Sequence, residues 1–115
     1  MGEFTFKKSK TIDVKSEAGE IVKTYTMDVG NYEKLKMWMS KAKEIDALAK
    51  RNAEGEPVID DILALEKEVI NMMTGGDFEF LWELSEHNVF ALLAFVNYMA
   101  GFVQEEMRTL RGQYQ

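Results

Sequence analysis

The sequence predicts an α+β protein dominated by helix, with an N-terminal β-hairpin packed on a bundle of three main helices and one short helix. Two patterns indicate this fold. Apolar side chains alternate at two-residue spacing in residues 1–30, and recur at three- and four-residue spacing from residue 31 onward. A chain of 115 residues that is 46% hydrophobic and 30% charged has the size and composition of a folded globular domain. We therefore expect one domain, 1–115, comprising the hairpin (1–30) and a helical part (31–115).

The hairpin is predicted from two alternating segments on either side of a turn. The first segment places four apolar side chains on one face: Phe4, Phe6, Ile12 and Val14. Residues 16–20 (SEAGE) have turn composition, with a glycine suited to positive φ. The return strand presents a second alternating set: Ile21, Tyr25, Met27 and Val29. Because a lone two-stranded ribbon is marginal in water, we expect this apolar face to lie on the helices.

Two helices should follow the hairpin. The first is expected from a cap at Asn31 to about Asn52, with one apolar stripe: Leu35, Trp38, Met39, Ala42, Ile45 and Ala49. Gly55 should end it, and Pro57 should start the second helix. The second helix should end at Gly75-Gly76, and its predicted core face has six members: Ile59, Ile62, Leu63, Val69, Ile70 and Met73.

The last third of the chain predicts a short helix and then a long one. Asp77 begins the short helix, with Phe78, Leu81 and Trp82 turned inward. The final helix is expected from about Asn88 to Leu110. Its stretch VFALLAFVNYMAGFV, residues 89–103, contains Asn97 as its one strongly polar side chain. About 15 residues fall short of the roughly 20 needed to cross a bilayer, so the stretch predicts a buried or partner-bound helix.

Charge is unevenly distributed along the chain. The formal net charge is −6, and residues 54–86 contain ten acidic residues against Lys67 alone, a local charge of −9. An acidic surface repels phosphate backbones and anionic headgroups, so neither nucleic acid nor a membrane surface is expected as a partner. The run is also typical of a solvated helix face that keeps a protein soluble. Without cysteines or a charged-then-apolar leader after Met1, a cytoplasmic protein is expected.

No constellation in the sequence predicts catalysis, a metal site or a cofactor. His87 is the only histidine, and Glu83 lies one helical turn before it. We expect His87 to be a structural residue of the turn that precedes the last helix. Asp60 and Asp61 are explained by a favourable interaction with a helix N-terminus. Gly75-Gly76 lacks the surroundings of a phosphate-binding loop. We therefore expect a protein that is not an enzyme and that has no cofactor.

The final helix provides the candidate interaction site. One stripe already supplies a full core face: Val89, Leu92, Leu93, Val96, Ala100, Val103, Met107 and Leu110. Further aromatic and methionine side chains surround the same helix, and either the hairpin and short helix cover them or another chain does. The predicted partner-binding residues are Phe90, Phe95, Tyr98, Met99, Phe102 and Met107. Methionine and aromatic side chains suit faces that accept varied apolar partners.

Three segments resemble a known family. The opening FTFKKSKTIDV, the closing strand KTYTMDV and the stretch GGDFEFLWELSEHNVFALLAFVNYMAGFVQEE are similar, in their order and pattern, to small tail-assembly chaperones of Gram-positive siphophages and related prophages. The resemblance covers nearly the whole chain. It implies a non-catalytic protein of the host bacterial cytoplasm that binds the tape-measure protein, a long apolar helical chain, and helps to recruit tail-tube subunits.

The residues leave other functions open. The leading hypothesis predicts client binding or self-association into a homo-oligomer through the last helix. The alternatives are a joining subunit of the phage particle, or an inhibitor that docks its acidic surface on a basic host enzyme. A joining subunit would persist in finished particles, whereas a chaperone would be lost. Binding by an inhibitor would weaken steeply with salt.

Overall fold

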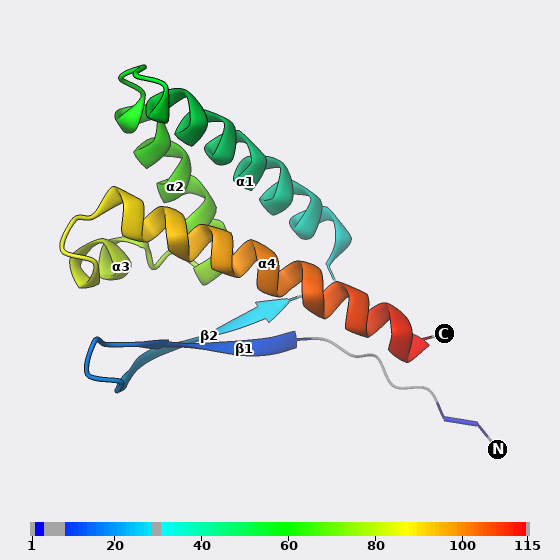
Figure 1. The fold of residues 1–115 in the computed structure, drawn as a ribbon. Coiled ribbons are helices and arrows are strands. Elements are labelled where there is room, and N and C mark those ends of the chain that lie inside the picture. The colour runs from blue at the N-terminus through cyan, green and yellow to red at the C-terminus, as the bar shows by residue number, and fades with distance from the viewer. Residues whose placement is uncertain (1, 4–8, 29–30, 115) are drawn as a thin grey trace.

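The computed structural model confirms an α+β fold dominated by helix (Figure 1). It describes residues 2–3, 9–28 and 31–114; the predicted apolar positions Phe4, Phe6 and Val29 lie outside these ranges, as does the side chain of Leu110. Two strands precede four helices: β1 (Ser9–Lys15), β2 (Ile21–Asp28), α1 (Tyr32–Ala53), α2 (Ile59–Thr74), α3 (Phe78–Leu84) and α4 (Val89–Tyr114). In Figure 1, α4 runs between the hairpin below it and the α1–α2 pair above it.

The predicted hairpin is present. β1 and β2 pair antiparallel, with Ile12 opposite Tyr25 and a register shift between Val14 and Lys15. In the turn, the Gly19 amide donates to the Ser16 carbonyl at 2.9 Å, and the φ of +88° at Gly19 explains why glycine suits this position. Ile12, Tyr25 and Met27 are buried against the helices. Ile21 was predicted on this face but is exposed, because it lies at the tip of the hairpin, where the register shift interrupts the alternation of the two faces.

The α1 and α2 helices form an antiparallel pair whose ends follow local chemistry. The Asn31 side chain accepts a hydrogen bond from the Lys34 amide at 3.1 Å, which confirms the predicted cap. The α2 helix ends at Gly75 in the left-handed conformation, as predicted. Its start differs: the first helical residue is Ile59, two positions after Pro57. Ile59 was predicted in the core but is exposed, because it lies in the first turn of α2.

One apolar cluster joins the hairpin to all four helices. Each element contributes at least one fully or nearly fully buried side chain: Ile12 from β1, Met27 from β2, Ile45 from α1, Val69 from α2, Leu81 from α3 and Val96 from α4. The predicted stripe of α1 is present, with Leu35, Trp38 and Ile45 buried and Met39, Ala42 and Ala49 partly buried. The hairpin therefore shares its core with the helical part.

A hydrogen bond between residues far apart in sequence fixes the hairpin on the helices. The Tyr25 hydroxyl donates to Asp77 Oδ2 at 2.5 Å, and Lys23 Nζ lies 3.7 Å from the same oxygen. Burial, together with the hydrogen bond and negative charge of Asp77, raises the pKa of Tyr25 above its usual value. Since Asp77 is used in this way, its side chain does not cap α3. The Asn71 side chain instead accepts from the Phe78 amide at 3.0 Å.

Glu66 is a core residue that the apolar pattern did not predict. It lies on the buried face of α2, is fully buried, and neither carboxylate oxygen has a hydrogen-bond partner among the described residues. Burial in apolar surroundings disfavours the charged form, so the pKa of Glu66 is raised from 4.5 to about 8. The core therefore holds a protonated carboxylic acid at neutral pH.

Replacing Tyr25 by phenylalanine should destabilise the fold by about 1–2 kcal/mol, because a hydrogen bond to a charged acceptor is lost while the buried ring remains. Urea unfolding measures this free energy. Tyr32→Phe is the matched control, since Tyr32 is 66% exposed and should respond by less than about 0.5 kcal/mol. Equal free energies of unfolding for the two variants would contradict the anchoring role of Tyr25.

Glu66 should make stability fall as pH rises. The unfolded chain releases this proton near pH 4.5 and the folded chain near pH 8, so the unfolded state is favoured progressively between these values. From pH 5 to pH 8 the loss should be about 3 kcal/mol at 1.36 kcal/mol per pH unit. Glu66→Gln should flatten this dependence when urea unfolding is measured at both pH values. The exposed control Glu17→Gln should retain it; a flat profile in the wild-type protein would refute a raised pKa.

Candidate protein-interaction site

The α4 helix begins with a strong local signal and packs one face on the core. The Asn88 side chain accepts hydrogen bonds from the amides of Phe90 and Ala91, each at 3.0 Å, and so caps the helix. Four side chains at three- and four-residue spacing are then buried: Leu92, Val96, Met99 and Val103. This spacing fixes which sides of α4 are left to solvent.

The predicted partner-binding residues fall into three groups by exposure. Phe90 is 55% exposed, Tyr98 61% and Met107 39%. Phe95 and Phe102 are half-buried and pack against the core cluster. Met99 is 0% exposed, so it belongs to the core rather than to the exposed face on which we expected it. The sequence pattern did not separate Met99 from its neighbours because apart from Asn97 no strongly polar side chain in residues 89–103 marks the exposed side.

The exposed aromatic residues do not form one continuous face. At about 100° per residue, Phe95, Tyr98 and Phe102 share one side of α4. We call these three residues the aromatic flank. Phe90 lies on another side of the helix. Met107 points in nearly the same direction as the core residues, yet is partly exposed because α4 extends past the body of the protein (Figure 1).

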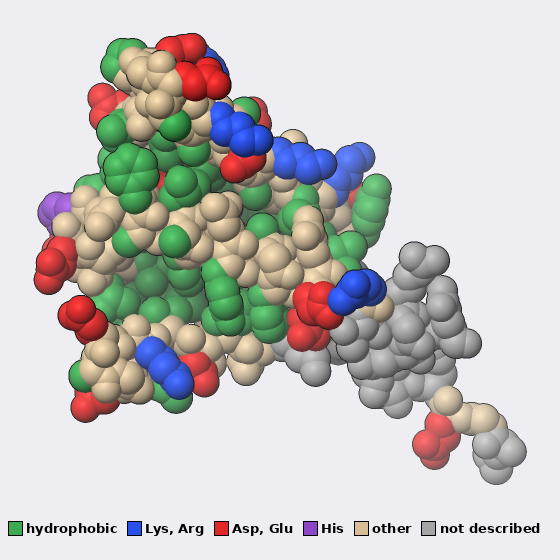
Figure 2. Space-filling model, in the orientation of Figure 1, with side chains coloured by type: hydrophobic (Ala, Val, Ile, Leu, Met, Phe, Trp, Pro, Cys, Tyr) green, Lys and Arg blue, Asp and Glu red, His purple; other side chains and the backbone are tan. Residues whose placement is uncertain are grey.

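The surface around α4 is hollowed and apolar. Figure 2 shows hollows on both sides of this helix, one toward α1 and α2 and one toward the hairpin, each with hydrophobic side chains at its floor. No charged residue occurs from Val89 to Val103. The polar side-chain contacts near this span lie beyond its two ends: the hydrogen bond between His87 and Glu83 at 2.9 Å, and the ion pair of Glu105 with Arg108 at 2.8 Å. A partner helix in either hollow would therefore meet mainly apolar side chains.

His87 has the predicted place in the turn before α4. Its φ of +62° lies in the left-handed region, and its amide donates to the Trp82 carbonyl at 2.9 Å. The imidazole stacks on Trp82 with ring centroids 4.7 Å apart and bonds Glu83 on the surface. Within the part of the chain that the structure describes, no group of three or more histidine, aspartate or glutamate side chains could hold a metal ion. Asp60 and Asp61 lie in the first turn of α2, as predicted.

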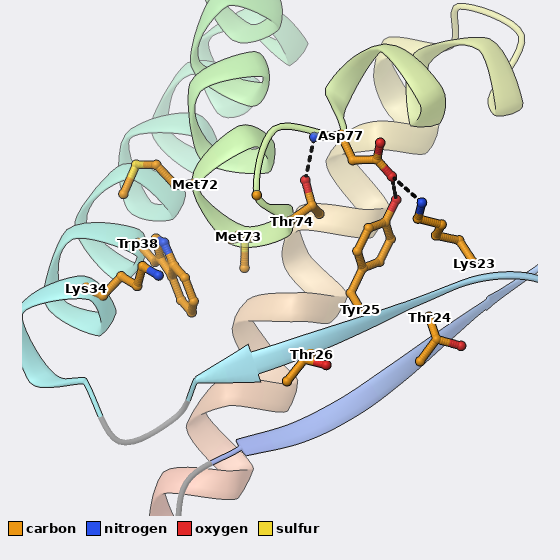
Figure 3. A pocket seen from close by; sticks show the side chains of 11 residues that line it. Lys23, Thr24, Tyr25, Thr26, Lys34, Trp38, Met72, Met73, Thr74 and Asp77 are labelled. Carbon is orange, nitrogen blue, oxygen red and sulfur yellow. Dashed lines mark hydrogen bonds and ion pairs between the residues drawn. The ribbon is translucent and has the colours of Figure 1, made fainter.

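A second feature, which the sequence did not predict, is an open pocket of about 500 Å³ (Figure 3). It lies between β2 and the helices α1 and α2. Residues 23–26 of β2 line one side. Lys34 and Trp38 of α1 and the C-terminal end of α2 line the other, with Asp77 at the rim. These residues come from three separate parts of the chain, so no local motif could have indicated the pocket.

Comparison with known proteins found no match among family models, curated proteins or solved structures. Among the described residues, no helix is long and apolar enough to span a membrane.

The two neighbouring residues Tyr98 and Met99 should differ sharply in their effect on folding. Met99→Ala should lower the free energy of unfolding by about 2–4 kcal/mol, because it leaves a cavity in the core. Tyr98→Ala should change it by less than about 0.5 kcal/mol, because the ring is mostly in solvent. Urea unfolding of both variants tests this division of α4. A large loss for Tyr98→Ala would show that Tyr98 supports the fold and is not free to bind a partner.

Proposed function

We propose that this protein is a non-catalytic, chaperone-like protein of phage or prophage tail assembly. It binds apolar helical segments of the tape-measure or tail-tube protein through the aromatic flank of α4 and the hollow beside it. The observation that carries the proposal is that α4 has a complete core face and still presents aromatic side chains on an uncharged surface four turns long. Aromatic residues contribute much of the energy at protein interfaces.

The mode of binding follows from the shape and chemistry of this surface. A helix that is apolar on more than one side needs a second neighbour, and the surface between α4 and the hairpin is hollowed and lined by hydrophobic side chains (Figure 2). An amphipathic helix can lie in such a hollow with its apolar side chains spaced three and four residues apart. Removing apolar surface from water supplies roughly 25 cal/mol per Å², which favours binding of clients whose apolar faces are still uncovered.

The acidic part of the surface suits the same role. Asp60, Asp61, Glu79 and Glu86 are exposed, and the net charge of −6 would keep a complex with an apolar client in solution. Binding to the client before assembly needs only preferential affinity for the unassembled form. The choice of tail proteins as clients rests on the resemblance of the sequence to tail-assembly chaperones.

The exposed acidic residues also support a second candidate, an inhibitor that docks on a basic host enzyme. In that case the acidic residues of α2 and α3, rather than the aromatic flank, would carry the binding energy. Raising the salt concentration would then weaken binding strongly, whereas a contact dominated by apolar burial would respond little.

Truncating Tyr98 should weaken client binding without affecting the fold. For purified protein and a soluble fragment of the tape-measure protein from the same genetic element, we expect Tyr98→Ser to raise Kd about tenfold, since one interface aromatic contributes about 1.4 kcal/mol or more. Isothermal titration calorimetry measures Kd. Tyr32→Ser, at an equally exposed tyrosine on α1, is the control and should change Kd by less than twofold.

Two results would contradict the proposal. One is an unchanged Kd for Tyr98→Ser. The other is binding that is abolished by Asp60→Asn with Asp61→Asn and by high salt, which would show that the acidic residues rather than the aromatic flank carry the binding energy. Either result can be assigned to binding because all these residues are exposed, so the variants should fold.

A further inference from the structure

The pocket beside the hairpin borders an unpaired strand edge. Side chains of consecutive strand residues point to opposite faces of a sheet. Lys23, Thr24, Tyr25 and Thr26 nevertheless all line this one pocket, as consecutive residues do when a pocket runs along the backbone at the edge of a strand. The strand pairs with β1 alone, and residues 23–26 make no backbone hydrogen bond to another described element. The second edge of β2 therefore offers free amide and carbonyl groups to the pocket.

The opposite wall of the pocket combines an apolar surface with a positive charge. Met72 provides the partly exposed apolar part, and Trp38 and Met73 lie behind it in the core, with 2% and 5% of their surface exposed. Lys34 Nζ lies 5.9 Å from the centre of the Trp38 ring and forms no ion pair with any carboxylate that the structure describes. In Figure 3, Lys34 and Trp38 lie together on α1, across the pocket from Tyr25.

The one acidic group at the pocket is already engaged. Asp77 accepts the hydroxyl of Tyr25 and lies 3.7 Å from Lys23 Nζ. Thr74 is engaged too, because its hydroxyl donates to the Ile70 carbonyl at 2.6 Å and accepts from the Asp77 amide. What the pocket leaves unused is therefore the edge of β2, an apolar wall and the ammonium group of Lys34, all within a protein whose net charge is −6.

We propose that this pocket binds an extended peptide segment of a partner protein, which adds a third strand at the free edge of β2. The segment carries an apolar residue against Met72 and, two positions along on the same face, an acidic residue paired with Lys34. Two positions in a strand span about 6.6 Å, which places both side chains on the helix-facing side. Backbone pairing supplies affinity and the alternate side chains supply specificity, as in other strand-addition complexes.

Charge selects the occupant. Lys34 attracts an acidic side chain, because Lys23 is already paired with Asp77 and Lys34 has no carboxylate partner among the described residues. A lysine at a strand edge also discourages pairing with basic strands. No residue of α4 lines the pocket, so this site is separate from the aromatic flank and does not depend on the proposed function.

A random nine-residue peptide display library selected on the intact protein tests the proposal. Enriched sequences should contain an apolar residue two positions from an acidic one. A capped synthetic peptide of the enriched sequence should slow hydrogen exchange at least tenfold at the outward-pointing amides among residues 23–26. Methylating alternate backbone nitrogens of that peptide should abolish binding, since it removes the donors that pair with β2.

Two matched charge reversals distinguish binding in the pocket from non-specific attraction between the peptide and the protein's surface charge. Lys34→Glu should weaken binding of the peptide at least tenfold, whereas Lys36→Glu, on the same helix but outside the pocket, should change it by less than twofold. The proposal is overturned if no sequence is enriched, if Lys34→Glu binds equally well, or if the methylated peptide still binds. It is also overturned if the amides of β2 become protected as the protein alone is concentrated, because the edge would then pair with a second copy.

Discussion

An isolated two-stranded sheet is at best marginally stable in water, so the hairpin must pack on the helices. The position in which it packs determines which surfaces of α4 and β2 stay exposed. The hairpin buries Ile12, Tyr25 and Met27 against the helices, and the bond from Tyr25 to Asp77 fixes it at the junction of α2 and α3. With the hairpin held there, one side of α4 faces a hollow instead of a packed neighbour (Figure 2). The same placement leaves the second edge of β2 open beside α1.

The apolar side chains of α4 occupy two different environments around the helix. One face of α4 is buried in the core through residues such as Val96 and Met99. Tyr98, which lies between these two residues in the sequence, is mostly exposed to solvent. The half-buried rings of Phe95 and Phe102 connect the two environments. Apolar side chains exposed singly are common on proteins, but a charge-free stretch of four helical turns is a surface that a partner can cover with little loss of solvation.

The helices and turns could be predicted from the sequence because they depend on neighbours in the chain. Asn31, Gly19 and Gly75 act within a few residues of themselves, and each has its predicted role. Periodicity also identified most of the core. It failed at Ile21 and Ile59, which lie in the first positions of β2 and α2, where burial is incomplete. It also failed at Met99, because a stretch without charged residues does not reveal which side is inside.

Other features depend on contacts between distant residues and had no signal in the sequence. Tyr25 and Asp77 are 52 positions apart, and the pocket assembles residues from β2, α1 and α2. Any local pattern predicts Glu66 to be a charged surface residue, although its side chain is fully buried on the core face of α2. The predicted partner-binding residues all lie on α4, but their division into the aromatic flank, Phe90, the projecting Met107 and the buried Met99 required the packing of the whole fold.

Site-specific photo-crosslinking tests most directly whether the aromatic flank is the contact surface for a tail protein. A photoreactive phenylalanine derivative in place of Tyr98 would be irradiated in cells that carry the protein's own genetic element, with the same derivative in place of Tyr32 as the control. The binding role of α4 predicts an adduct from position 98, and not from position 32, with an apolar helical segment of the tape-measure or tail-tube protein. No adduct at position 98, or the same adducts from both positions, would contradict it.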